Sequence, residues 1–371
     1  MSWKGLRKIL CLRLDGLNDI LTTEPAIRAL KESNPGAKMT LLTSKSAANL
    51  GRLLASVDDV IAFDAPWADA GRVSDGPAHH DLIATLRERG FDAAVIFSSH
   101  HQNPMPEALV CLLAEIPRRL AHCRENPHGL LSDWVEEVEP VKILRHEVRR
   151  QLELVASVGC HTSDERIRVK IPGDTRRRVT EILKERGVRA ESPFVIVHPG
   201  NQQTPGRAET LGAIVRELSL RLNHQILLTG DEADRAILAE IQEAARVPCY
   251  ALSDVFRLDE LAHLFSRSTL VISSSTCALN LSTAVRTPVV DLRTQQDPSR
   301  TPWLVPYRSL IIDFEGRFQG RGGPRLAEPT QVVLAAHELL WDLTERHRVK
   351  TPKVVTFNRE LPSERVLNLG S

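Results

Sequence analysis

The stretch Ile9-Leu10-Cys11-Leu12-Arg13-Leu14-Asp15-Gly16-Leu17-Asn18-Asp19 decides the fold. Its apolar first half is typical of a buried parallel strand, and apolar residues at helical spacing follow it: Ile20, Leu21, Ile27 and Leu30. A turn from a strand into a helix lies at the carboxyl edge of the sheet, where open α/β proteins bind their ligands. Asp19 is therefore a candidate acid or base, or a helix N-cap that only accepts backbone hydrogen bonds. The turn lacks Gly-x-Gly-x-x-Gly, which argues against a dinucleotide fingerprint.

The composition is that of an ordinary globular protein. The chain has 371 residues, of which 42% are hydrophobic and 26% charged, and its formal net charge is +1. This length exceeds one typical core and predicts two domains. The near-zero charge disfavours a nucleic-acid binder. The six cysteines are dispersed without a Cys-x-x-Cys pair, which favours a reducing compartment and predicts neither a metal site nor a disulfide framework: Cys11, Cys111, Cys123, Cys160, Cys249 and Cys277.

Two features of the chain bear on its location. The N-terminal segment is basic, but Arg13 and Asp15 interrupt its apolar run, so we expect no signal peptide. No apolar run approaches the roughly 20 residues that a membrane-spanning helix needs. We therefore predict a cytoplasmic protein and leave open a peripheral contact with the inner face of the membrane.

Strand-like and helix-like segments alternate along the chain, which predicts parallel sheets with helices on both faces. In the first half we expect strands at 9–14, 39–43, 60–63, 93–98 and 119–122, and helices at 23–33, 80–89, 106–114 and 146–158. The polar segment 159–174 is interpreted as a linker. In the second half we expect strands at 194–197, 225–229, 249–252, 270–273, 288–292 and 310–314, and helices at 175–186, 209–222, 235–245, 258–266, 278–285 and 329–347.

The predicted fold class is therefore α/β, with two Rossmann-like doubly wound domains that face each other across a cleft. We place the first domain at 1–165, the second at 166–347 and a C-terminal tail at 348–371. Ligands of such folds sit outside the carboxyl ends of the strands, so the residues that follow the strands are the candidates for function.

Three strand ends in the second half carry candidate residues, and each has a purely structural alternative. His198-Pro199-Gly200-Asn201 could line a phosphate pocket or be a strand-end turn. Gly230-Asp231-Glu232 could accept ribose hydroxyls or form the first turn of a helix. The segment 274–278, Ser-Ser-Thr-Cys-Ala, with Asn280 in the helix behind it, could bind a diphosphate at a helix N-terminus or be a serine-rich cap.

In the first half, two histidines follow a strand. His100 and His101 could contact a polyol or a phosphate, and no Asp, Glu or Cys at ligand spacing suggests a metal there. His146 starts a predicted helix, which favours a capping or packing role.

Together these segments resemble glycosyltransferase family 9, the ADP-heptose:lipopolysaccharide heptosyltransferase family, over about residues 8–345. The resemblance rests on an ordered series of short matches: Arg13, Asp15 and Asp19; 25–30; 35–37; 41–43; His198-Pro199-Gly200; 228–230; 258–262; 271–288; and 297–307.

The resemblance implies a GT-B architecture, with the donor bound by the second domain, the acceptor by the first, and inversion at the anomeric carbon without a metal or cofactor. It implies that Asp19 is the general base, and that amides and hydroxyls around Ser275 and Thr276 hold the diphosphate leaving group. The donor is expected to be a nucleotide-diphosphate sugar, an ADP-sugar first, and the acceptor a glycan or lipid-linked glycan. The implied donor site is His198, Gly200, Asn201, Arg207, Gly230, Glu232, Ser275, Thr276, Cys277 and Asn280, and the implied acceptor site is Arg13, Asn18, His100 and His101.

The chain departs from the family at three places. Asn18 replaces the usual glycine before the aspartate, although asparagine tolerates positive φ. Ser275-Thr276-Cys277 and Asn280 stand where the family has Asp-Thr-Gly or Asp-Ser-Gly and a histidine. The family's Lys/Arg-Trp-Pro segment is shortened to 202–207, where Arg207 is the candidate cation.

The leading hypothesis is an inverting, metal-independent glycosyltransferase that moves heptose or a similar sugar onto a lipopolysaccharide or polysaccharide-type acceptor. Because the donor segment is altered, a GT-B pseudoenzyme that binds a glycan or partner protein is the second hypothesis. A two-lobed sugar-binding protein is the third, although such proteins are normally exported.

Overall fold

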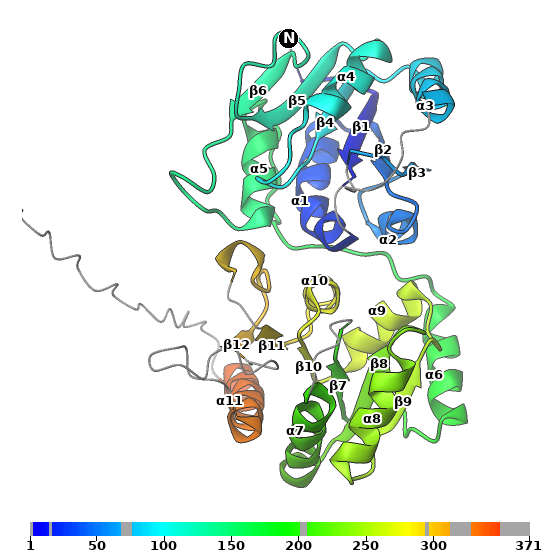
Figure 1. Cartoon of the computed structure of the whole chain (residues 1–371), viewed down its shortest axis with the longest axis vertical. Coiled ribbons are helices and arrows are strands. Elements are labelled where there is room, and N and C mark those ends of the chain that lie inside the picture. The colour runs from blue at the N-terminus through cyan, green and yellow to red at the C-terminus, as the bar shows by residue number, and fades with distance from the viewer. Residues whose placement is uncertain are drawn as a thin grey trace, which may run out of the picture.

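The chain forms two α/β domains, one above the other (Figure 1). The computed structural model describes residues 3–14, 17–67, 76–200, 206–293, 297–311 and 328–348. Each domain is built on a six-stranded sheet, and every strand pair in these sheets is parallel. The predicted pair of doubly wound domains is therefore confirmed. Within the described ranges, every helix is too short or too polar to cross a bilayer.

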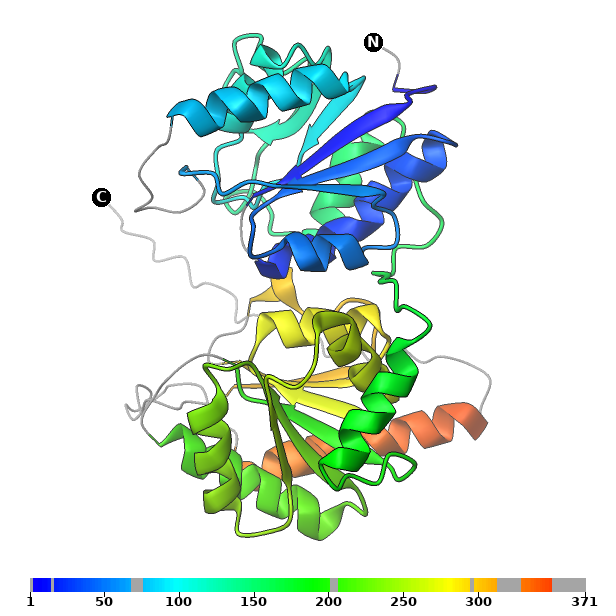
Figure 2. The ribbon, with the colours of Figure 1, turned by 90° about the vertical axis from the view of Figure 1, so that its right-hand side faces the viewer.

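The first sheet has the strand order β3-β2-β1-β4-β5-β6. Its strands β1, β2 and β4 are buried almost throughout because helices cover both faces: α1 and α5 pack together on one face, and α3 and α4 on the other (Figures 1 and 2). The elements are β1 (Lys8–Arg13), α1 (Leu17–Ser33), β2 (Lys38–Thr43), α2 (Ala48–Leu53), β3 (Asp59–Ala62), α3 (Gly76–Arg89), β4 (Ala93–Ile96), α4 (Met105–Leu113), β5 (Arg118–Cys123), β6 (Asp133–Glu136) and α5 (Glu147–Ala156).

The second sheet repeats this pattern in the order β12-β11-β10-β7-β8-β9. Helices α7, α8 and α11 pack on one face, and α6, α9 and α10 form a second group. The elements are α6 (Thr175–Glu185), β7 (Phe194–His198), α7 (Arg207–Arg221), β8 (Gln225–Gly230), α8 (Arg235–Ala245), β9 (Tyr250–Ser253), α9 (Leu258–Arg267), β10 (Leu270–Ser273), α10 (Thr276–Ala284), β11 (Val289–Arg293), η1 (Pro298–Arg300), β12 (Tyr307–Ile311) and α11 (Pro329–Arg348).

In each sheet, the order in which the chain adds strands changes direction once. In the first sheet the reversal lies between β1 and β4, and in the second between β7 and β10. A crevice opens at the carboxyl end of such a switch point, because the connections on its two sides run to opposite faces. The loops after these four strands are therefore the places where the fold itself puts a ligand.

The two domains are packed together, with α10 lying directly below α1 (Figure 1). One buried apolar cluster runs from Ile20 and Leu21 of α1 to Ala278 and Leu281 of α10. The segment 159–174 does not hang free between the domains. Arg28 of α1 donates hydrogen bonds to the carbonyls of Asp164 and Arg166, at 2.6 and 2.5 Å.

Several predicted boundaries needed correction. Helix α1 begins at Leu17 and not near residue 23, although Pro25 lies inside it and cannot donate a backbone hydrogen bond. The sequence analysis missed α2 and β6, which are short and only partly apolar. The last predicted strand, 310–314, begins earlier, at Tyr307, and its residues 312–314 lie outside the described part of the chain, as does the tail.

Candidate functional site

Asp19 lies in the first turn of α1, directly after the first switch-point strand. It is a member of the helix and not its N-cap, so the capping alternative does not describe it. The hydroxyls of Thr22 and Thr23 both donate to its backbone carbonyl, at 2.8 and 2.9 Å. The side chain is almost buried, with the residue 6% exposed. Its backbone is thus fixed by neighbours within the same helix, and its carboxylate is held in a confined space.

Two arginines flank the Asp19 carboxylate. Arg300, from the second domain, pairs with both oxygens: Nη1 to Oδ1 at 3.0 Å and Nη2 to Oδ2 at 3.3 Å. Arg13, the last residue of β1, places Nη2 at 3.8 Å from Oδ2. Arg13 makes a shorter contact with Glu147 at the start of α5, at 2.9 Å. The carboxylate is therefore held chiefly by a cation from the opposite domain.

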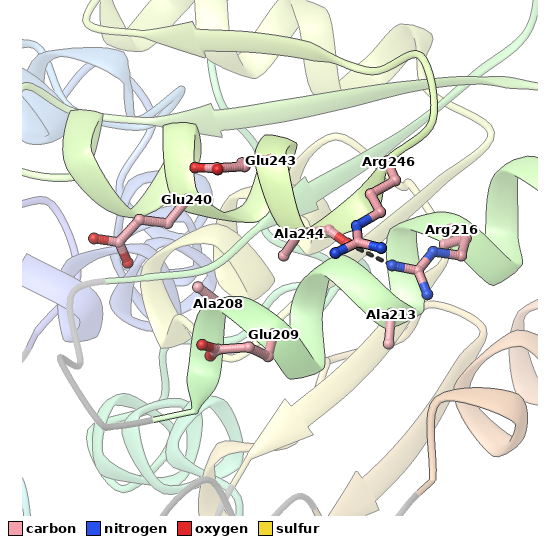
Figure 3. A pocket seen from close by; sticks show the side chains of 8 residues that line it. All are labelled: Ala208, Glu209, Ala213, Arg216, Glu240, Glu243, Ala244 and Arg246. Atoms are coloured by element: carbon pink, nitrogen blue, oxygen red, sulfur yellow. Dashed lines mark hydrogen bonds between the residues drawn. The ribbon is translucent and has the colours of Figure 1, made fainter.

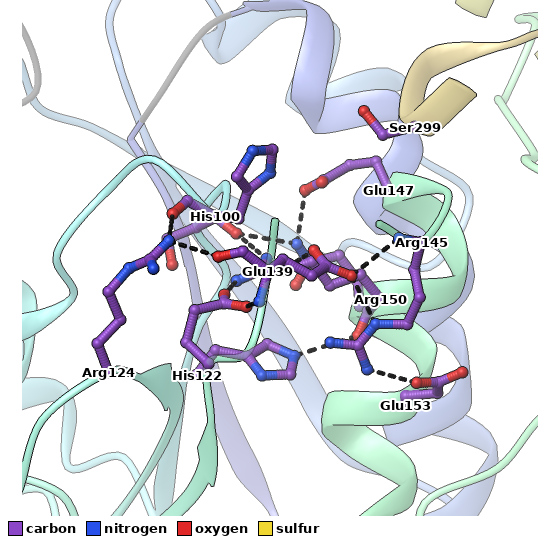
Figure 4. A network of polar contacts seen from close by, with 12 residues as sticks. His100, His122, Arg124, Glu139, Arg145, Glu147, Arg150, Glu153 and Ser299 are labelled. Atoms are coloured by element: carbon purple, nitrogen blue, oxygen red, sulfur yellow. Dashed lines mark hydrogen bonds and ion pairs between the residues drawn. The ribbon is translucent and has the colours of Figure 1, made fainter. Parts of the chain in front are cut away.

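Glu147, the partner of Arg13, belongs to a network of polar contacts with Arg150 and Glu139 in the first domain (Figure 4). Glu147 accepts from Arg13 and from Gln151, the latter at 2.6 Å, and Gln151 also donates to the carbonyl of Ser98 at 3.1 Å. Burial alone would raise the pKa of Glu147, but the charges of Arg13 and Arg150 outweigh burial and lower it to about 2. Glu147 therefore remains charged at neutral pH and holds the Arg13 guanidinium, which lies 3.8 Å from Asp19.

Arg150 forms the centre of the same network. It donates to the carbonyl of Ser98 and to Glu137, and its Nε lies 3.2 Å from Glu139. The carbonyl of Arg150 is 3.3 Å from Nε2 of His122. Burial, with the Arg150 charge, lowers the pKa of His122 to about 4. Arg150 of α5 thus holds the loop after β4 in place, and the two glutamates beside it balance its charge.

The predicted acceptor residues gather at this edge only in part. His100 and His101 follow β4, and their ring centroids lie 3.8 Å apart. Arg124 donates to the carbonyl of His100 at 2.6 Å, and burial lowers the pKa of the His100 ring. Arg13 is fully buried, and its guanidinium lies beside the Asp19 carboxylate. The side chain of Asn18 lies outside the described residues.

In the second domain, the loop after β7 lies in close contact with the loop after β10. Gly200 has φ +74°, and a Cβ there would lie 3.0 Å from the Cβ of Ser275. His198 Nδ1 is 3.1 Å from Oγ1 of Thr229 on β8. Burial lowers the pKa of His198 to about 4, so its ring is neutral at pH 7. Asn201 lies outside the described residues.

Serines at the end of β10 and directly after it donate hydrogen bonds to the end of β7 and the loop that follows it. Ser273 donates to the carbonyl of His198 at 2.7 Å, and Ser274 donates to the carbonyl of Pro199 at 2.5 Å. Ser275 is the N-cap of α10 and accepts from the amide of Ala278 at 3.5 Å. Part of the predicted donor segment is therefore structural, whereas Ser275 and Thr276 stand at the helix N-terminus as expected.

Three further predicted donor residues lie close by. Arg207 is 1% exposed and donates to the carbonyl of Pro199 and to Ser274 Oγ, so its guanidinium supports the loop after β7. Burial raises the pKa of Cys277 to about 11, which keeps the thiol protonated. Asn280 is buried within α10. Their contact with a donor remains a prediction.

Gly230 and Glu232 occupy the turn between β8 and α8. A Cβ at Gly230 would lie 2.5 Å from the Cβ of Asp234, so only glycine fits the turn. Glu232 is exposed and pairs with Arg235 at 3.0 Å, a contact that lowers its pKa. A ribose contact at Glu232 remains a prediction, and it would have to compete with Arg235.

The sequence analysis assigned no role to the segment 297–303, although it matched the family there. This segment follows β11 and reaches the first domain. The carbonyl of Thr301 is 2.8 Å from Nε2 of His146, and Trp303 stacks on the His146 ring with centroids 4.4 Å apart. His146 also caps α5, as predicted, by accepting from the amide of Val148 at 3.2 Å.

Two other features of the described residues lie apart from the predicted chemistry. A hollow of about 670 Å³ lies between α7 and α8 (Figure 3). Arg216 in its wall donates to the carbonyls of Ala244 and Ala245, and the hollow contains none of the predicted site residues. Among the described residues, no group of three His, Cys, Asp or Glu side chains could hold a metal ion.

Comparison with known proteins gives a consistent result. The sequence model of glycosyltransferase family 9 (heptosyltransferase) matches residues 79–315. Lipopolysaccharide heptosyltransferase 3 of Escherichia coli strain K12 is 24% identical over 313 residues, which cover 81% of this chain and 86% of that protein.

Solved structures share the fold. The family 9 glycosyltransferase of Veillonella parvula DSM 2008 superposes with a TM-score of 0.75 at 16% identity, covering 92% of this chain and 99% of that one. E. coli ADP-heptose lps heptosyltransferase II superposes with a TM-score of 0.70 at 20% identity, covering 91% and 99%. The two-domain architecture is therefore GT-B.

Proposed function

Because the chain belongs to glycosyltransferase family 9, we propose that it transfers a sugar with inversion, using Asp19 as the general base. This proposal rests on one observation: the carboxyl edges of the two sheets meet at Asp19. Asp19 follows β1 of the first sheet, and Arg300 follows β11 of the second, yet their side chains form an ion pair. An acceptor bound by one domain and a donor bound by the other would therefore meet at Asp19.

The chemistry follows from this placement. Asp19 removes the proton from an acceptor hydroxyl as that oxygen attacks the anomeric carbon. The bond between the anomeric carbon and the diphosphate oxygen breaks on the opposite face, and its electron pair leaves with the diphosphate, which inverts the configuration. A positioned base typically contributes on the order of 10²–10⁴-fold in rate.

The second domain is suited to the leaving group. Ser275 and Thr276 stand at the N-terminus of α10, where the helix dipole favours an anion. The hydroxyl of Thr229 and the neutral ring of His198 nearby carry no negative charge of their own. Stabilisation by oriented dipoles is the usual route in such sites, and on this proposal it needs no metal.

We propose an ADP-sugar as the donor, heptose first, and the lipopolysaccharide core as the acceptor. Support comes from the heptosyltransferase family model and from the names of the E. coli proteins that the chain resembles. Ser275-Thr276-Cys277 replaces the family's acidic donor motif, so a panel of nucleotide sugars is the decisive test of this proposal.

The test is a donor panel. Purified protein is incubated with ADP-heptose, ADP-glucose, UDP-glucose and GDP-mannose, with and without truncated lipopolysaccharide, and nucleotide release is measured. We expect acceptor-dependent release with the ADP-sugar, unchanged by EDTA, and an inverted anomeric configuration by NMR. No release with any donor, together with no nucleotide affinity by calorimetry, would contradict the proposal and favour a binding protein.

A further inference from the structure

Arg300 lies closer to a carboxylate of the first domain than to Asp297 of its own turn, from which its Nε is 3.7 Å away. It ends the single turn η1 in the segment between β11 and β12, far from β1 in the sequence, yet its guanidinium covers both oxygens of Asp19. It is 30% exposed at the side chain, whereas Asp19 is 8% exposed at the side chain. This two-point geometry is the arrangement in which arginine fixes the orientation of a carboxylate.

The position of Arg300 depends on the docking of the two domains. Within its own turn, Asp297 accepts from the amide and hydroxyl of Ser299, at 2.9 and 2.6 Å, which fixes the turn locally. The next residues are anchored on the first domain: Thr301 through its carbonyl to His146, and Trp303 through Nε1 to the carbonyl of Glu165 at 2.8 Å. Separation of the domains would break these contacts and withdraw Arg300 from Asp19.

The first domain by itself holds the carboxylate less firmly. The Arg13 guanidinium is 3.8 Å from Asp19 but 2.9 Å from Glu147, so the glutamate is the closer of these two carboxylates. An aspartate side chain with one distant cation can rotate about its terminal torsion, which is a soft motion. Arg300 removes that freedom when the domains close.

We propose that Arg300 is a positioning residue: it orients the Asp19 carboxylate for proton abstraction, and it does so only when the domains are docked. The proposal rests on the proposed function of Asp19. It makes domain closure a condition for an oriented base, and therefore links acceptor activation to the arrival of the donor domain.

The test compares Arg300→Gln and Arg300→Lys with Arg308→Gln, which alters an arginine paired with Asp342 inside the second domain. With ADP-heptose and truncated lipopolysaccharide, we expect kcat of Arg300→Gln to fall roughly 10- to 100-fold with KM little changed, the scale expected for a misplaced reacting group. Lysine should restore part of kcat because it keeps the charge, and Arg308→Gln should match wild type. A kcat for Arg300→Gln at or above wild type would overturn the proposal.

A second measurement needs no substrate. Urea unfolding midpoints are compared for wild type, Arg300→Gln, Asp19→Asn and the double variant. We expect Arg300→Gln to lower the midpoint in the wild-type background and to lower it less in the Asp19→Asn background, because the charged partner in the first domain is gone while Asp297 remains. Equal shifts in both backgrounds would show that Arg300 acts independently of Asp19. If the midpoints are coupled but Asp19→Asn keeps full activity, the proposed base fails while the contact stands.

Discussion

The two switch points of this molecule use different chemistry for the same task. Around Asp19, the first domain buries full charges and neutralises them in pairs, from Arg13 and Glu147 to Arg150 and Glu137. Around Ser275, the second domain uses hydroxyls, backbone carbonyls, a neutral histidine and one buried cation, Arg207. The edge with paired charges suits a group that must accept a proton, and the edge with hydroxyls and a cation suits a site that must receive an anion.

The difference also predicts how each edge responds to substitution. Loss of one partner from a buried ion pair leaves an uncompensated charge, which costs far more than the loss of one neutral hydrogen bond. Substitutions that change charge should therefore have the larger effect at the first-domain edge, and substitutions that change side-chain shape should have the larger effect at the second-domain edge.

The largest stability effect is expected at Glu147. Glu147→Gln keeps the shape but removes the negative charge 2.9 Å from the buried Arg13, so the free energy of unfolding should fall by about 3–5 kcal/mol. Urea unfolding measures this value. The control is Arg149→Gln, which removes the exposed pair with Glu165 and should cost no more than about 1 kcal/mol. Equal losses in the two variants would contradict the idea that the first edge depends on buried charge.

A smaller effect is expected from His198 as the pH falls. Its folded pKa of about 4 lies below the unfolded value near 6.5, so the unfolded chain binds more protons between these values. The contribution is fully present above pH 6.5 and is lost as the pH falls towards 4, by roughly 3 kcal/mol. His198→Gln should flatten this part of the unfolding curve, and His161→Gln should leave it unchanged. A wild-type slope in His198→Gln would refute the neutral ring.

The smallest predicted effect distinguishes the cost of a left-handed backbone from the cost of a steric contact. Gly200 and Gly206 have nearly the same φ, +74° and +76°, but a Cβ meets Ser275 at Gly200 and open space at Gly206. Alanine at either site should cost about 1–2 kcal/mol for the left-handed backbone. Gly200→Ala should in addition displace Ser275 and weaken ADP binding in calorimetry. An equal ADP affinity in both variants would show that the loop contact does not shape the donor site.

The parts of the fold that were predictable are those with repeated local signals. Nearly every long apolar strand and amphipathic helix lies within a few residues of its predicted place, because burial on both faces leaves a continuous apolar run. Strand β6 was missed because its residues alternate between half-buried and exposed, and α2 because it spans six residues.

The candidate site was less predictable, for a physical reason. Asp19 and Ser275 stand directly after strands, so their place at the sheet edge can be inferred from the sequence alone. Arg300 and Glu147 act through partners 281 and 134 residues away in the chain, and no local pattern encodes such a pairing. Arg207 was predicted as a donor contact from its position after the shortened segment, and the structure shows its bonds to the loop after β7.

The most direct test of the central claim is the turnover of Asp19→Asn. This change keeps the size of the side chain and removes its ability to accept the acceptor proton. With ADP-heptose and truncated lipopolysaccharide, we expect kcat to fall by roughly 10²–10⁴-fold while ADP affinity stays at the wild-type value. Asp342→Asn, which alters an exposed carboxylate of α11, should retain full activity. Transfer by Asp19→Asn at the wild-type rate would contradict the account.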